Sequence, residues 1–384
     1  MRQIGWIGLT LAIVVAGCDQ ELFEPAESHV RYTAVSAGGE HSCGLTWNGE
    51  LYCWGRGWNG ELGDGRVESR SWPAAVRGDR KYTHVASGWN HSCALSVTGR
   101  VYCWGWNALG QLGIGAYIGL GLPDSVASEH SFRALSAGPY HTCGVTTTGE
   151  AYCWGLNAHG QLGDGTTETN PSPVLVVGSH DFIDITAGTS HTCALTGAGV
   201  AYCWGSNHVG QLGDGTTNNA TMPVMVAGGL RWSSLSAGAT HTCGLTQSNE
   251  IYCWGSNEYG ELGNGALQRP GLPGAVVPHP IGGGLKYRMV SAGASHSCGI
   301  ANDRNLYCWG RGIYGQLGIG GTADRSMPQW VGSDYTMVSA GQGTHSCAVR
   351  TDETSVCWGT GPSGQLGAYG TTFAPVPVRV GTRR

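Results

Sequence analysis

An internal repeat of about 50 residues constrains this sequence more than any other feature. His-Ser/Thr-Cys occurs seven times, and a Cys-Trp-Gly follows each copy. The first motif recurs after 50 residues four times, then after 55 and 49: His41, His91, His141, His191, His241, His296 and His345. In solenoids and propellers, such a period marks one unit of supersecondary structure. The seven copies fill residues 30–380 and leave no room for a second domain.

Each copy contains four segments with strand character. In the first copy we expect strands at residues 32–37, 41–46 and 51–55. A fourth lies in a Pro-Val segment, such as residues 173–177 or 223–226. Glycine makes up 66 of the 384 residues, which suits short strands joined by tight turns. The pattern predicts an all-β, seven-bladed β-propeller of four-stranded blades over residues 30–384.

The ends of the chain suggest how the ring closes. No Pro-Val segment precedes the first copy, whereas the last copy ends in one at residues 375–380. We expect this last segment to join the sheet begun by residues 32–37. Pairing of the N- and C-terminal strands would remove exposed strand edges at the seam.

The fourteen repeat cysteines form seven pairs, each ten residues apart. Residues 47–49 suit a three-residue hairpin turn with glycine in the left-handed position. Counting outward from this turn places Cys43 opposite Cys53 at a non-hydrogen-bonded position, where Cα atoms lie about 4.5 Å apart. The spacing therefore predicts one disulfide inside every blade: Cys43–Cys53, Cys93–Cys103, Cys143–Cys153, Cys193–Cys203, Cys243–Cys253, Cys298–Cys308 and Cys347–Cys357.

A metal site is the competing interpretation of the same residues. His41, Cys43 and Cys53 could supply zinc ligands, but seven identical three-ligand sites in one exported protein would be unusual. We expect the repeat histidines to bond backbone groups at blade turns. The aspartates of the Gly-rich turns are interpreted as turn residues rather than calcium ligands: Asp64, Asp164 and Asp214. We expect no metal and no cofactor.

The repeat resembles a known family. G-x-x-H-[ST]-x-x-L-T followed by W-G-x-N-x-x-G-Q-L-G resembles the regulator-of-chromosome-condensation repeat, and the likeness covers essentially the whole chain after residue 29. The resemblance implies a seven-bladed propeller. The family's eukaryotic founder is a guanine nucleotide exchange factor that uses a wedge inserted in the propeller. Here the longest excess over the repeat is five residues, within residues 266–284, so exchange activity is an alternative that rests on family analogy.

The N-terminus predicts export and lipid anchoring. Residues 1–17 contain one arginine followed by a short apolar stretch, and they end in small residues before Cys18. This pattern resembles the lipobox of bacterial lipoproteins, in which the cysteine is acylated; an ordinary secretory signal is the alternative. Residues 18–29 are interpreted as an acidic tether. Fifteen cysteines favour an oxidising compartment, so we expect the bacterial cell envelope, on its periplasmic side or surface.

Charge and motifs narrow the function. The formal net charge is −5 with two lysines, Lys81 and Lys286, and no basic tract, so nucleic acid is not an expected partner. No G-x-S-x-G, H-E-x-x-H or phosphate-binding loop is found, and we expect no enzyme.

Aromatic residues that do not recur in every copy mark a binding face. By the strand order, the loop before residue 41 and the loop after residue 55 emerge at the same end of the blade. The candidate partner-binding residues lie in such loops: Trp58, Trp89, Trp106, Tyr140, Tyr259 and Tyr314. The opposite tips carry one such aromatic, Trp47. We therefore expect an envelope-anchored, non-enzymatic module that binds a protein partner; binding of carbohydrate or cell wall through the same aromatics is the alternative.

Overall fold

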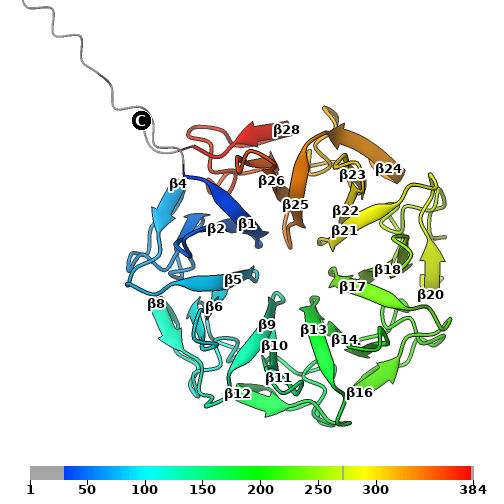
Figure 1. The fold of residues 1–384 in the computed structure, drawn as a ribbon, viewed down its shortest axis with the longest axis horizontal. Coiled ribbons are helices and arrows are strands. Elements are labelled where there is room, and N and C mark those ends of the chain that lie inside the picture. The colour runs from blue at the N-terminus through cyan, green and yellow to red at the C-terminus, as the bar shows by residue number, and fades with distance from the viewer. Residues whose placement is uncertain (1–29, 270–271, 382–384) are drawn as a thin grey trace, which may run out of the picture.

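Seven antiparallel four-stranded sheets surround a central axis in the computed structural model, which describes residues 30–269 and 272–381 (Figure 1). One strand of each sheet lies next to the axis. These innermost strands are β1 (Tyr32–Ala37), β5 (Tyr82–Ser87), β9 (Phe132–Ala137), β13 (Phe182–Ala187), β17 (Trp232–Ala237), β21 (Tyr287–Ala292) and β25 (Tyr335–Ala340). The described residues contain no helix, and so none that could cross a membrane.

The other three strands follow outward in chain order. The second strands are β2 (His41–Thr46), β6 (His91–Ser96), β10 (His141–Thr146), β14 (His191–Thr196), β18 (His241–Thr246), β22 (His296–Ala301) and β26 (His345–Arg350). The third strands are β3 (Leu51–Gly55), β7 (Val101–Gly105), β11 (Ala151–Gly155), β15 (Ala201–Gly205), β19 (Ile251–Gly255), β23 (Leu306–Gly310) and β27 (Ser355–Thr360). The outer strands are β4 (Arg70–Ala75), β8 (Leu120–Ser125), β12 (Asn170–Leu175), β16 (Ala220–Met225), β20 (Ala275–Pro280), β24 (Arg325–Gly332) and β28 (Phe373–Arg379).

The seven-bladed propeller is confirmed, and the first three strands of the first copy have the expected bounds. The fourth strand lies earlier than expected: β12 is Asn170–Leu175 rather than 173–177, and β16 is Ala220–Met225 rather than 223–226. The reason is the register, because Asn170 already pairs with Gly155 across a bulge. The Pro-Val segment is therefore the end of the strand, not its start.

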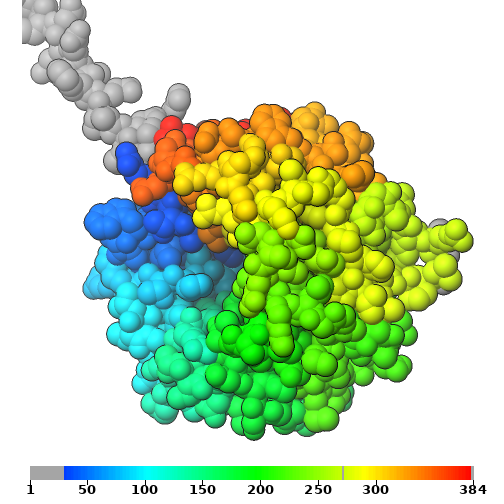
Figure 2. Space-filling view, turned by 45° about the vertical axis from the view of Figure 1, so that its right-hand side comes forward, coloured from blue at the N-terminus to red at the C-terminus, as the bar shows by residue number. Residues whose placement is uncertain are grey.

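The expected closure by terminal strand pairing is wrong. β28 is the outer strand of the last blade, in the order β25-β26-β27-β28, and β1 belongs to a complete blade β1-β2-β3-β4. Each repeat copy carries all four strands of one blade, so no strand is left over to exchange. The first and last blades pack side by side instead, with Tyr32, Val35 and Trp54 against Val349 and Leu366. Figure 2 shows this seam, where blue and orange segments adjoin.

Adjacent blades are joined by one repeated set of hydrogen bonds. The carbonyl of Glu61 accepts bonds from Trp104 Nε1 at 2.8 Å and from Ser92 Oγ at 3.0 Å. His41 Nε2 lies 2.8 Å from the same Ser92 oxygen. Because the serine proton goes to the carbonyl, the histidine must donate through Nε2. These histidines thus bond a hydroxyl of the next blade, rather than the backbone group that we expected.

The same bond occurs at all seven junctions, and the seam is closed by Ser42 and His345 at 2.8 Å. All seven histidines are completely buried. Burial lowers the pKa of six of them to about 3 and that of His296 to about 4. The histidines therefore form a neutral ring of hydrogen bonds around the propeller.

Each blade contains one disulfide between its second and third strands, in the seven pairings that the spacing predicts. In blade 1, Leu45 pairs with Leu51, and Cys43 pairs with Cys53. The Cα atoms of the pairs lie 4.0–4.1 Å apart, somewhat closer than the expected 4.5 Å. Gly49 holds the left-handed turn position with φ of 80°. Cys18 and the predicted signal and tether, residues 1–17 and 18–29, lie outside the described residues.

Candidate functional site

The strand order gives the propeller two different faces. In each blade, the connection after the first strand (residues 38–40 in blade 1) and the connection after the third strand (residues 56–69) leave at the same end. We call this end the long-loop face. The opposite end carries hairpin turns such as residues 47–50 and connections such as residues 76–81, and we call it the turn face. All six predicted partner-binding aromatics belong to long-loop-face connections.

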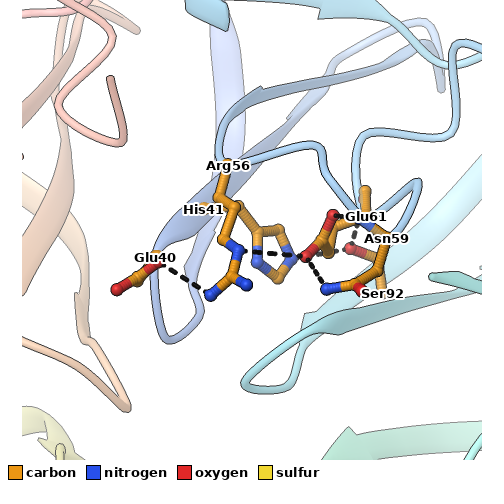
Figure 3. A network of polar contacts seen from close by, with 6 residues as sticks. All are labelled: Glu40, His41, Arg56, Asn59, Glu61 and Ser92. Carbon is orange, nitrogen blue, oxygen red and sulfur yellow. Dashed lines mark hydrogen bonds and ion pairs between the residues drawn. The ribbon is translucent and has the colours of Figure 1, made fainter. Parts of the chain in front are cut away.

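Blade 1 presents a tryptophan beside a paired arginine. Trp58 is 65% exposed, and the Arg56 guanidinium carbon lies 4.9 Å from its ring centroid. Arg56 Nη1 contacts Glu40 Oε2 at 3.0 Å, and Arg56 Nε lies 3.8 Å from Glu61 Oε1 (Figure 3). Glu61 is fully buried, and it also accepts bonds from the backbone nitrogen and the Nδ2 of Asn59. Burial raises the pKa of Glu61, and these partners oppose the rise.

A second aromatic group lies between blades 2 and 3. The rings of Trp106 and Tyr140 meet edge to face, with centroids 6.5 Å apart. Both residues are half-buried, and so is Trp89. Trp89 lies over Gly39, where a Cβ atom would come within 2.8 Å of Trp89 Cγ. Trp89 and Trp106 thus pack against neighbouring loops as well as facing solvent.

A third group spans blades 5 and 6. The guanidinium carbon of Arg311 lies 4.6 Å from the ring centroid of Tyr259 and 5.4 Å from that of Tyr314. Tyr314 is 37% exposed, and Tyr259 is half-buried. Among the described residues, no carboxylate lies within ion-pair distance of Arg311, and its buried Nε has no hydrogen-bond partner. This arginine presents a free charge between two aromatic rings.

Glu261 lies next to the third group. Its side chain is buried, and Oε2 accepts a bond from the Tyr259 backbone nitrogen at 2.9 Å. Five other copies have glutamine at this position. Burial, with a smaller contribution from the nearby Glu258 and Asp324, raises the pKa of Glu261 to about 7.

Five of the six predicted residues therefore fall into three groups: Trp58 with Arg56, Trp106 with Tyr140, and Tyr259 with Tyr314 around Arg311. The sixth, Trp89, packs on Gly39 of blade 1. Sequence reasoning missed another aromatic pair, Trp72 and Tyr369, whose ring centroids are 6.2 Å apart. Tyr369 is an extra residue in the last G-Q-L-G turn, and this insertion was a signal that could have pointed to it.

The structure also bears on the metal-site interpretation and on the inserted residues of the long connection. All cysteines of the proposed zinc set are bonded in disulfides, and the part of the chain that the structure describes contains no group of three side chains that could hold a metal. Asp64, Asp164 and Asp214 accept turn bonds from backbone nitrogens two residues later. The long connection over residues 256–274 has no strand or helix in its described part.

Comparisons with known proteins agree with this architecture. The RCC1-like domain family matches residues 16–268, and the regulator of chromosome condensation (RCC1) repeat matches residues 248–300 and 290–316. The ultraviolet-B receptor UVR8 of Arabidopsis thaliana is 42% identical over 62 residues, which is 15% of this chain and 14% of the receptor. The match thus spans about a seventh of that receptor.

Solved structures show the same fold at low identity. Human WBSCR16 superposes with a TM-score of 0.78 at 20% identity, covering 86% of this chain and 93% of that one. Prp20p from Saccharomyces cerevisiae, studied with its binding to Gsp1p and histones, gives 0.72 at 24% identity, covering 82% and 81% of the two chains. Yeast RCC1 (Prp20) bound to Kap60 gives 0.74 at 23%, covering 92% and 85%. With most of its repeats matched by one family model, this chain belongs to the RCC1-like domain family.

Proposed function

We propose that this chain is an exported, lipid-anchored and non-enzymatic module that binds a protein partner through its long-loop face. The observation that carries the proposal is the set of aromatic and arginine groups on that face, at positions that most other copies fill with small, polar or aliphatic residues. Tryptophan, tyrosine and arginine are the residue types enriched at hot spots of protein interfaces. Yeast Prp20, which has the same fold, binds Gsp1p, histones and Kap60, and this supports a binding role by analogy.

Seven disulfides indicate an oxidising, exported environment. In our proposal, acylation of Cys18 holds the propeller in the bacterial envelope. A Cys18→Ser variant should then leave the membrane fraction, and persistence there after a high-salt wash would rule the anchor out. Guanine nucleotide exchange, the other activity suggested by analogy, is not part of the proposal.

A pair of exposed tryptophans on opposite faces provides the test. Trp58 on the long-loop face is 65% exposed and Trp47 on the turn face is 76% exposed, so replacing either should hardly change the melting temperature. Proteins crosslinked to the purified chain in envelope extract would be identified by mass spectrometry, and their affinity measured with purified components. We expect Trp58→Ala to weaken binding by about 30-fold or more, and Trp47→Ala to leave it unchanged.

The opposite ranking of the two variants would place binding on the turn face. Equal, unchanged affinities would remove Trp58 from the interface and leave the Tyr259 and Tyr314 group to be tested in the same way. A partner retained after all three groups are replaced would contradict the proposal. Trp89 and Trp106 are less suited to the first test, because both are half-buried and their replacement also disturbs packing.

A further inference from the structure

A cavity of about 400 Å³ lies at the seam between the last and first blades. One wall is the start of β4 with the residue before it, and the other is the connection between β27 and β28. The two walls approach closely: a Cβ atom at Gly364 would come 2.7 Å from the Arg70 carbonyl oxygen. We call this space the seam cavity. It lies at the long-loop end of the blades but contains none of the six partner-binding aromatics.

Two aromatic rings form the apolar part of the seam cavity. Trp72 is half-buried on β4, and Tyr369 is 75% exposed. Their ring planes are inclined by 42°, so together they form an angled surface rather than a closed stack. The face of an aromatic ring is electron-rich and attracts weakly positive C–H groups. A ligand face with several C–H groups is suited to such a surface.

Hydroxyl groups form the polar part. The side chains of Ser71, Ser363, Thr371 and Thr372 line the cavity, and their hydroxyls have no hydrogen-bond partner among the described residues. The hydroxyl oxygen of Ser69 is buried and likewise unpartnered. A hydroxyl can donate one hydrogen bond and accept two, and a buried one that does neither is costly. The cavity therefore offers several donors and acceptors to a ligand that carries both.

The charges around the cavity exclude an ionised ligand. The lining contains no aspartate, glutamate, lysine, arginine or histidine. Arg70, whose guanidinium carbon lies 5.8 Å from the Trp72 ring centroid, is already paired with Glu68 at 2.9 Å and with Asp64 at 3.6 Å. A charged ligand would lose hydration without gaining a counter-charge, and a purely apolar ligand would leave the hydroxyls unpaired.

From this combination we propose that the seam cavity binds a neutral saccharide, with one face of a pyranose ring on Trp72 and Tyr369 and its hydroxyls on the serines and threonines. A pyranose such as glucose carries axial C–H groups on its faces and hydroxyls around its edge, which matches the two parts of the cavity. The volume of about 400 Å³ falls within the range of small-molecule sites. The proposal is independent of the protein-binding function, because the two sets of residues do not overlap.

Saturation-transfer NMR with the purified chain tests the proposal. The probes are glucose, N-acetylglucosamine, cellobiose and diacetylchitobiose, with glucuronate as the charged comparison. We expect at least one neutral probe to bind and glucuronate to bind at least about tenfold more weakly than glucose. Trp72→Ala and Tyr369→Ala should each weaken binding of the neutral probe by about tenfold, the loss of one aromatic contact.

A matched control distinguishes this site from general exposure of tryptophan. Trp330 is 60% exposed on the outer strand β24, and it lies outside the seam cavity. Trp330→Ala should leave saccharide binding unchanged. Tyr369 is so exposed that its replacement should not affect folding, which melting curves would verify. The proposal is overturned if no neutral probe binds at millimolar concentration, if glucuronate binds as well as glucose, or if Tyr369→Ala binds like the unaltered chain.

Discussion

Arg56 in blade 1 and Arg311 in blade 6 occupy the same position of the repeat, yet their surroundings differ. Arg56 shares its copy with Glu61 and reaches Glu40, so its charge is neutralised. Arg311 has Gln316 in its own copy, and the buried acid Glu261 is in the preceding one. Blade 1 thus contains a paired set of charges, whereas blades 5 and 6 contain a free cation and a separate buried acid.

This difference shows which groups at this position the fold requires and which can vary. At the position of Glu61 and Glu261, the fold uses the backbone carbonyl, which accepts bonds from the tryptophan and hydroxyl of the next blade. The side chain at this position is free to be glutamine or glutamate. Each blade can therefore change the electrostatics of the long-loop face without changing the junction beneath it.

The difference between blades 1 and 6 exists only in the folded chain, and the largest expected effect is on acid unfolding. The seven buried histidines have folded pKa values of about 3 to 4, below the usual 6.5. Between these values the unfolded chain binds protons that the folded chain does not bind. Above pH 6.5 the histidines do not change the unfolding free energy with pH. Below it, the unfolding free energy should fall by about 10 kcal/mol per pH unit, so we expect cooperative unfolding near pH 5, measured by circular dichroism.

Replacing His191 and His241 by glutamine retains a side-chain N–H donor at two junctions. This double variant should unfold at lower pH than the unaltered chain. A chain that stays folded at pH 4, or an unchanged midpoint in the double variant, would show that the histidine ring does not control acid stability.

The second test concerns the separate acid. The pKa of Glu261 is raised from 4.5 to about 7, so its burial costs nothing below pH 4.5 and the cost grows until about pH 7. Glu261→Gln should therefore stabilise the chain by about 3 kcal/mol at pH 8, as measured by urea unfolding. If the gain were the same at pH 5.5 as at pH 8, the acid would not be protonated in the folded chain. Glu61→Gln removes the ion pair with Arg56 and should therefore give a smaller gain in unfolding free energy.

The smallest effects come from the two arginines. Arg56→Met leaves Glu61 buried without its cation, and we expect a loss of about 2 kcal/mol in unfolding free energy, less than for a fully buried pair because Arg56 is partly exposed. Arg311→Met removes no ion pair, only the contacts with the Tyr259 and Tyr314 rings, and should cost about 1 kcal/mol or less. Equal losses in the two variants, measured by urea unfolding, would mean that the free and paired arginines do not differ.

Much of the fold could be predicted because the same pattern of strands and turns occurs in all seven repeat copies. The hairpin turn at Gly49 sets the register of β2 and β3, and this register brings Cys43 opposite Cys53. The repeat period does not indicate whether an outer strand pairs within its own copy or with the next one, so the closure of the ring was predicted wrongly. The strand order depends on pairing across a bulge at Gly55, which no local pattern reveals.

The candidate site could be predicted less completely, because it depends on contacts between copies. Failure to recur identified Trp58 and Tyr314 as candidates, and both are exposed. The stacking of Arg311 on Tyr259 joins two copies and has no signature in either one. Trp72 and Tyr369 are separated by almost the whole chain, and they meet because the ring closes.

The seam has a consequence for how such a chain could be rearranged. Because Ser42 and His345 make the same bond as the histidine and hydroxyl at every other junction, the protein has no structurally privileged first blade. New termini opened on the turn face between any two blades, with the old ends linked, would give a circular permutant with the same core. Gain or loss of the gene segment that encodes one repeat copy would likewise add or remove a whole blade with its disulfide, and no sheet would be divided.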